Sequence, residues 1–198
     1  CFDQAISISP YMFDGYFFRG TLWLDEKKYD LALTDLERAI RISPSRFEAY
    51  VARGILRMER GDTPAAFDDF NFAVKTTSKS SIARYYRGEA HRRIGNLKQA
   101  AADFESATKI DPRDGYPYFG RGLIHMNNGA AEAAIKEFTA AVTLNSWIAP
   151  AYANRGLAYF SLGKKAESQK DFDRAISLDP AIKTDIDEGI RVLERTKR

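Results

Sequence analysis

Apolar and small residues recur along this chain with a fixed period of 34 residues. The columns of this period hold a glycine, an alanine, a large apolar residue, and a proline or serine. The glycine column consists of Gly20, Gly54, Gly88, Gly122 and Gly156. The large apolar column consists of Phe2, Leu36, Phe70, Phe104, Phe138 and Phe172. Because four columns keep one register without a gap, the pattern predicts a repeat architecture.

Each period predicts two helices, since apolar and small residues recur every three or four positions in both halves. We expect the first helices at residues 14–26, 48–60, 82–94, 116–128 and 150–162. We expect the second helices at residues 30–43, 64–77, 98–111, 132–145 and 166–179. Turn glycines lie between the two helices at Gly61, Gly95, Gly129 and Gly163. Thr63 is expected to cap its helix, with Pro64 at the first helical position.

The pattern resembles the tetratricopeptide repeat family, whose period is also 34 residues. Tyr16-x-x-Arg19-Gly20-x-x-Trp23 has an aromatic, a glycine and an aromatic where the family has them, and the Asp-Phe-x-x-Ala pattern recurs at Asp69. The resemblance covers nearly the whole chain. It implies an all-α, right-handed superhelical solenoid of antiparallel helix pairs, and it implies binding to other proteins.

Five periods fill residues 11–180 and leave a segment at each end. Residues 1–10 are expected to be the second helix of a truncated repeat. Residues 181–198 are expected to be a capping helix, about 182–195, followed by a basic tail, because solenoids need a polar end. The half repeat and the missing initiator methionine suggest a piece of a longer protein, and a lipid-anchored Cys1 is the alternative.

One column departs from the family, because arginine stands where leucine is common. An acid follows each arginine 16 residues later, and the turn lies midway, so the two side chains are expected at similar heights. The pairs are Arg19 and Asp35, Arg53 and Asp69, Arg87 and Asp103, Arg121 and Glu137, and Arg155 and Asp171. We expect a structural ladder of ion pairs, within a repeat or between neighbours. An arginine-lined phosphate site is the alternative.

In the family, the first helix of each pair is expected to line the concave side of the solenoid. Three columns on these helices point away from the core of their own repeat, at 100° per residue. The candidate groove residues are Phe17, Leu24, Val51, Ile55, Met58, Tyr85, Arg92, Phe119, Leu123, Met126, Leu157 and Phe160. Their apolar character favours an apolar or amphipathic segment of another protein as the partner. Packing between successive repeats is the other interpretation.

The same columns bear on two further classes of partner. A clamp for chaperone C-terminal carboxylates needs lysine and asparagine there, and only Asn154 matches, so we do not expect one. Basic residues gather around the third repeat, from Lys75 to Lys98. They suit an acidic partner, a phosphorylated segment or RNA, but a solvated face is the simpler interpretation.

Composition narrows the remaining classes. The chain has 198 residues, 44% hydrophobic and 29% charged, with a formal net charge of +3. This charge is too small to indicate nucleic-acid binding. No stretch has the roughly 18 apolar residues of a membrane span.

Catalytic and metal-binding patterns are not evident in the sequence. The single cysteine, Cys1, excludes an internal disulfide. His91 and His125 share a column with aromatic residues and are expected to be half-buried, and no catalytic motif is present. We therefore expect no enzyme activity, metal or cofactor. The compartment stays open, with a cytoplasmic location as the default.

The sequence favours a scaffold for protein–protein interactions. Two alternatives stay open: a module for homo-oligomerisation, and the adaptor region of a larger enzyme.

Overall fold

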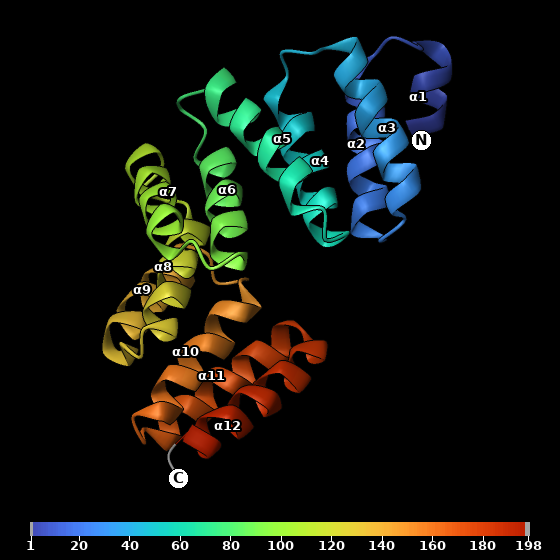
Figure 1. Cartoon of the computed structure of the whole chain (residues 1–198). Coiled ribbons are helices and arrows are strands. Elements are labelled where there is room, and N and C mark those ends of the chain that lie inside the picture. Colours follow the sequence, from blue (N-terminus) through green and yellow to red (C-terminus); the bar gives the residue numbers. More distant parts are fainter. Residues whose placement is uncertain (1, 197–198) are drawn as a thin grey trace. The chain divides into compact units, whose positions relative to one another are not determined.

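The computed structural model describes residues 2–196, and over that range it consists of α-helices joined by short turns (Figure 1). The first helices of the repeats are α2 (Phe13–Asp25), α4 (Phe47–Glu59), α6 (Ser81–Arg93), α8 (Gly115–Asn127) and α10 (Ala149–Ser161). The second helices are α3 (Tyr29–Ile42), α5 (Thr63–Thr76), α7 (Leu97–Ile110), α9 (Ala131–Leu144) and α11 (Lys165–Leu178). Helix α1 (Phe2–Ile8) precedes them, and a 3-10 turn (Pro180–Ile182) and α12 (Lys183–Thr196) follow. The all-α prediction is confirmed. The predictions for Cys1 and for the last two residues of the basic tail lie outside the described residues.

The chain divides into two compact units, Cys1–Ile94 and Gly95–Arg198. The division falls in the turn between α6 and α7, so each unit contains two complete helix pairs. The pairs α2/α3 and α4/α5 belong to the first unit, and α8/α9 and α10/α11 belong to the second. Within each unit, the first helix of a pair also packs against the second helix of the preceding pair. This packing of consecutive pairs is that of a tetratricopeptide-like solenoid.

Each repeat helix begins and ends one residue before its predicted position. The cap of α5 shows the reason. The carboxylate of Asp62 accepts a hydrogen bond from the backbone N–H of Ala65 at 3.3 Å, so Asp62 is the N-cap. Thr63 is therefore the first helical residue and Pro64 the second, and the prediction that Thr63 caps the helix was wrong by one position.

The turn between the two helices of a repeat needs a left-handed residue. Gly61, Gly95, Gly129 and Gly163 have φ between 70° and 81°. This conformation lets the next residue donate back into the helix, as in the 2.8 Å bond from Asp62 N to Arg57 O. In the first repeat Lys27 takes the same place with φ 58°, and Lys28 N makes the equivalent bond to Trp23 O at 2.8 Å. The backbone of the turn is therefore kept although the glycine is not.

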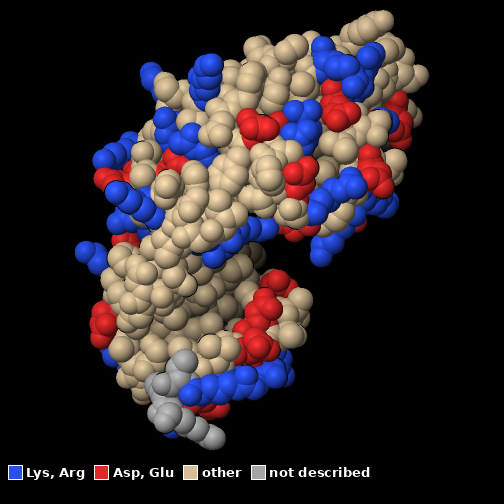
Figure 2. Space-filling model, viewed as in Figure 1, with Lys and Arg blue, Asp and Glu red and all other residues tan. Residues whose placement is uncertain are grey.

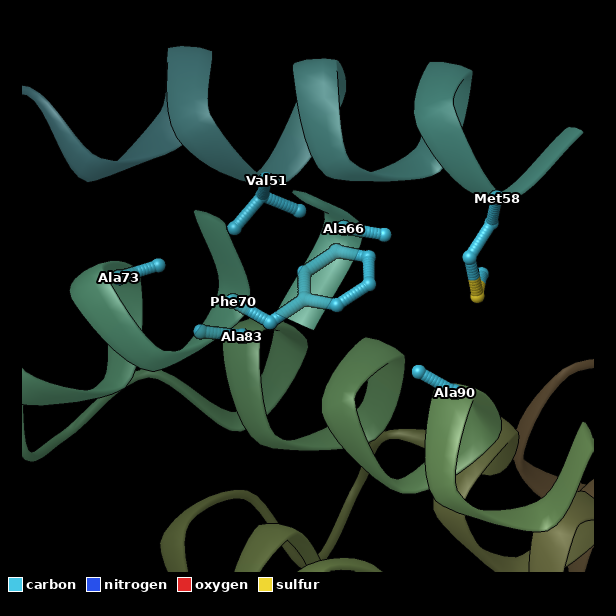
Figure 3. Packing of buried hydrophobic residues seen from close by; sticks show 7 residues of the cluster. All are labelled: Val51, Met58, Ala66, Phe70, Ala73, Ala83 and Ala90. Carbon is cyan, nitrogen blue, oxygen red and sulfur yellow. The ribbon is translucent and has the colours of Figure 1, made fainter. Parts of the chain in front are cut away.

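The core of each repeat is built from the small and large columns of the sequence. Figure 3 shows Phe70 of α5 beside Val51 of α4 and Ala83 of α6. A Cβ atom at Gly54 would lie 2.5 Å from the ring of Phe70, closer than atoms can pack. The glycine column is thus the place where the two helices of a pair approach most closely.

The two terminal helices pack differently. Ile182 and Ile186 are buried against Ala149, Ala153 and Phe172, so α12 is tied to α10 and α11. Helix α1 contacts α2, but none of its residues is buried. Among the residues that the structure describes, no helix has the length and apolar character to span a bilayer.

Candidate functional site

An apolar groove runs along the first helices of the N-terminal unit. It consists of two adjoining cavities of about 270 and about 330 Å³, which share Thr21, Ala52, Ile55 and Tyr86. The first cavity is also lined by Phe17, Phe47, Glu48, Val51 and Ile82. The second is also lined by Leu24, Asp25, Lys27, Tyr29 and Glu59. We call this surface the α4 groove.

The α4 groove follows one face of α4. Glu48, Ala52, Ile55 and Glu59 are three or four residues apart, which places them on one side of a helix. At 1.5 Å per residue they span about 16 Å. Side chains of α2 and α6 form the two walls. The middle of the groove is apolar, and an acidic residue stands at each end.

Arginines already neutralise both acidic ends. Glu48 accepts a hydrogen bond from Arg46 Nε at 3.2 Å, and Glu59 accepts one from Arg93 Nη2 at 3.1 Å. All four of these side chains are substantially exposed, so the pairs contribute little to stability. In Figure 2, basic and acidic side chains are interspersed on the face in view. The groove therefore offers apolar area at its centre and balanced charge at its ends.

The candidate groove residues of the first unit divide between groove and core. Phe17, Leu24 and Ile55 line the α4 groove and are half-buried. Val51 also lines it, but Val51 and Met58 are buried in the core that Figure 3 shows. For Met58, packing between neighbouring repeats describes its surroundings.

In the third repeat, two columns that are mostly apolar elsewhere carry a charged pair. Arg92 donates from Nε and Nη2 to the two carboxylate oxygens of Glu89, both at 3.0 Å. Burial of the Arg92 guanidinium lowers its pKa, but its hydrogen bonds to Glu89 and the charge of Glu89 together raise it above the ordinary value. Tyr85 is half-buried, with its ring edge-on to Tyr86 at 5.1 Å. This end of α6 is polar, unlike the groove.

The candidate groove residues of the second unit are packed between repeats. Phe119, Leu123 and Met126 lie against a buried cluster that contains Phe138 and Ala158. Leu157 and Phe160 lie against the cluster that includes residues of α12. All five are half-buried.

Four groove residues fall outside the columns that the sequence analysis considered: Phe47, Ala52, Ile82 and Tyr86. They belong to the sides of α4 and α6 that face the preceding repeat. Ile82 carried a signal, because it is apolar in a column that holds Asp14 and Glu48 in the two preceding repeats.

The arginine column makes charged contacts in both units. Arg19 donates from Nε and Nη2 to Asp35 at 2.7 Å each, and Arg155 makes the same two bonds to Asp171 at 2.7 and 2.8 Å. Arg53 reaches Asp69 at 3.0 and 2.7 Å. Arg121 makes one bond to Glu137, at 2.7 Å. Arg87 and Asp103 belong to different units, and their pairing stays a prediction.

Several of these arginines also reach the preceding repeat, 16 residues back. Arg19 donates to Asp3, Arg87 to Asn71 at 3.2 Å, and Arg155 to Thr139 at 3.1 Å. Arg19 and Arg155 therefore each contact two second helices at once. The sequence analysis left open whether the contacts lie within a repeat or between neighbours, and the structure shows both kinds.

The contacts keep the arginines charged. Hydrogen bonding to Asp35 is the main reason why the pKa of Arg19 is raised, and hydrogen bonding to Asp171 has the same effect on Arg155. For Arg53, burial lowers the pKa, but hydrogen bonding to Asp69 and its charge outweigh this effect and raise it. Because these guanidinium groups are turned toward carboxylates, they do not present an open cationic surface.

Metal and catalytic chemistry find no support in the part of the chain that the structure describes. It contains no group of three or more His, Cys, Asp or Glu side chains that could hold a metal ion. The ring of His91 lies 4.7 Å from that of Phe67, a packing contact between α6 and α5.

Comparisons with known proteins agree with this architecture. The matching family is described as the ETO1 C-terminal domain, and the match covers residues 15–196. No curated protein matches the sequence significantly.

Among solved structures, the APC/C hetero-tetramer Cut9–Hcn1 contains a chain that superposes with a TM-score of 0.88 at 17% identity. That match covers all of this chain and 39% of the other. TTC0263, a thermophilic tetratricopeptide protein of Thermus thermophilus, superposes with a TM-score of 0.79 at 20% identity, covering 90% and 99% of the two chains. YrrB, described as a tetratricopeptide protein with an unusual peptide-binding site, has a TM-score of 0.58 at 21% identity, covering 91% and 93%. These likenesses show the tetratricopeptide fold, which is generally a scaffold for protein–protein interactions and generally not catalytic.

Proposed function

The chain belongs to the family of the ETO1 C-terminal domain, and we propose that it is a non-catalytic interaction scaffold that binds an apolar or amphipathic segment of another protein in the α4 groove. No cofactor takes part in this binding. The observation that carries the proposal is the groove itself: a continuous apolar surface along the whole of α4, walled by α2 and α6. The peptide-binding site described for YrrB, which has the same fold, supports a peptide as the ligand.

The dimensions and chemistry of the groove favour one class of ligand. A length of about 16 Å accommodates about three turns of helix or about five extended residues. Apolar area in the middle favours a segment whose own apolar side chains lie on one face. A polar tail would leave its groups without partners against Ile55 and Ile82, which costs binding free energy.

A peptide selection tests this proposal. A random library of 16-residue peptides is selected on the native chain and counted by sequencing. The variant Ile82→Glu places a charge in the groove at a side chain that is 48% exposed, so it should still fold. Leu31→Glu is the matched control, because Leu31 is 50% exposed on α3 and does not line the groove.

We expect the enriched peptides to carry apolar residues at helical spacing, and to bind Ile82→Glu at least tenfold more weakly than Leu31→Glu. Peptides that bind all three proteins equally, or an enrichment of polar sequences, would contradict the proposal. Concentration-dependent mass that Ile82→Glu abolishes would favour self-association instead.

A further inference from the structure

The outer face of α2 exposes apolar side chains whose equivalents in later repeats are covered. Phe18 is 49% exposed and Leu22 is 41% exposed. Residues one or more periods after Leu22 are Leu56, Ala90 and Ala158, and all three are fully buried. In each case the cover comes from the first helix of the preceding repeat: Leu56 clusters with Phe17 and Leu24.

The neighbouring helix α1 shows the same difference. Phe2 is only half-buried, whereas its equivalents Phe70 and Phe138 are fully buried against the glycine of the first helix in their own repeat. Phe2 instead stacks on Phe18, with ring centroids 6.4 Å apart. Ala5 is half-buried as well, although Ala39 and Ala73 are fully buried. We call Phe2, Ala5, Phe18 and Leu22 the N-terminal face.

The buried equivalents describe what would cover this face. Ala90 clusters with Val51, Ile55 and Met58 of the preceding first helix. Ala158 clusters with Phe119, Leu123 and Met126. The helix that covers such a face therefore carries apolar residues three before, one after and four after its glycine, and the glycine itself packs on the large apolar residue of the second helix.

The opposite end of the chain does not offer that pattern. The equivalents of Ala153, Leu157 and Phe160 on α12 are Asp187, Arg191 and Glu194, and all three are exposed. A second copy stacked end to end would place these charges against Phe18 and Leu22, and burying charge without a partner is costly. The C-terminal end is therefore a poor cover for the N-terminal face.

We propose that the N-terminal face is a docking site for an α-helix of another protein that carries this glycine-centred apolar pattern. The docked helix continues the interface that already joins successive first helices of this chain. Its glycine packs on Phe2, and its apolar residues cover Leu22 and Phe18. This site is separate from the α4 groove, because none of its four residues lines the groove.

A helical peptide copied from this chain is the probe. Residues 46–60 contain the pattern as Val51, Gly54, Ile55 and Met58. A hydrocarbon staple that replaces the side chains of Ala52 and Leu56 holds the peptide helical, since short helices are marginal in water. These two positions point away from the docking interface. Fluorescence anisotropy then measures binding to the full chain.

We expect saturable binding that falls at least tenfold with Leu22→Asp in the protein or with Gly54→Val in the peptide. Leu31→Asp is the matched control and should bind like the native chain. Ile82→Glu should also bind normally, which distinguishes this site from the α4 groove. Circular dichroism verifies that each variant is folded.

Three outcomes would overturn the docking site: absence of saturable binding up to about 1 mM peptide, a concentration at which even weak association is detected, equal binding to Leu22→Asp, or equal binding of the Gly54→Val peptide. Sedimentation supplies a further one. If the native chain is a dimer and Leu22→Asp is a monomer, the N-terminal face is an interface between copies of this chain and does not bind a foreign helix.

Discussion

The first and fourth repeats build the same pair of helices from different residues. In the fourth repeat a Cβ at Gly122 would lie 2.4 Å from the ring of Phe138, whereas at Gly20 it would lie 3.0 Å from Leu36. The turn of the fourth repeat contains Gly129, and that of the first contains Lys27. The ion pair reverses the order: Arg19 makes two bonds to Asp35, but Arg121 makes one to Glu137.

This difference shows that the period specifies the backbone more strictly than the side-chain contacts. The first repeat has looser helix packing and a less favourable turn residue, together with the stronger ion pair. The fourth has tight packing and a glycine turn, with a weaker ion pair. Substitutions at equivalent positions should therefore have unequal effects, and three pairs of variants test this.

The ion pairs should give the largest difference. The side chain of Asp35 is 6% exposed, and its loss removes two charge-assisted bonds from Arg19. We expect Asp35→Ala to lower the free energy of unfolding by about 3 kcal/mol and Glu137→Ala to lower it by about 1.5 kcal/mol. Urea unfolding followed by circular dichroism measures both, and equal losses would contradict the comparison.

The pH dependence of this loss serves as a control. The folded-state pKa of Arg19 lies above its ordinary value of 12.5, so its contribution is fully present below that pH and is lost only as the pH rises through the folded value. The difference between the native chain and Asp35→Ala should consequently be the same at pH 7 and pH 9. A marked change in that interval would mean that another group titrates with the pair.

The glycine column should give the next largest difference. Gly122→Ala forces a methyl group into the ring of Phe138, and we expect a loss of about 2 kcal/mol. Gly20→Ala meets Leu36 at a distance where a small shift suffices, and alanine favours the helix, so we expect a change of less than about 1 kcal/mol. If Gly20→Ala is the more damaging variant in urea unfolding, the first repeat is not the looser one.

The turn should give the smallest difference. Lys27 occupies a left-handed conformation that disfavours side chains, so Lys27→Gly is expected to stabilise the protein by about 0.5 kcal/mol. Gly129→Lys makes the reverse change in the fourth repeat and is expected to cost about 1 kcal/mol. Thermal unfolding of the two variants and the native chain provides the measurement. Destabilisation by Lys27→Gly would show that the lysine side chain makes a contact that outweighs the strain.

The helix pairs were predictable from the sequence because the signal is repeated five times. Gly54 and Phe70 recur at the same spacing in nearly every period, so a chance match at one place does not affect the register. The boundaries were one residue late, because a proline at position 64 fits either the first or the second helical position. The sequence does not show which side chain accepts the capping bond.

The groove was less predictable than the helices. Columns on one helix indicate which direction a residue points, and Phe17 and Ile55 do line the groove. Met58 points in a similar direction but is buried, because the next first helix covers it. Phe47 and Ile82 enter the groove from the other side of their helices. Such contributions depend on how neighbouring helices cross, which the spacing within one helix does not contain.

The sequence by itself determined the period, the all-α class, the turn positions and the residues that oppose one another across a helix pair. These follow from local helix geometry, which repeats with the chain. The tertiary structure decided which apolar columns are covered and which are accessible, and that Arg19 and Arg155 each contact two successive repeats. Phe17 and Phe119 are equivalent in sequence, yet one lines the groove and the other lies between repeats. The reason is that accessibility depends on the side chains of the adjoining repeats, and these differ along the chain.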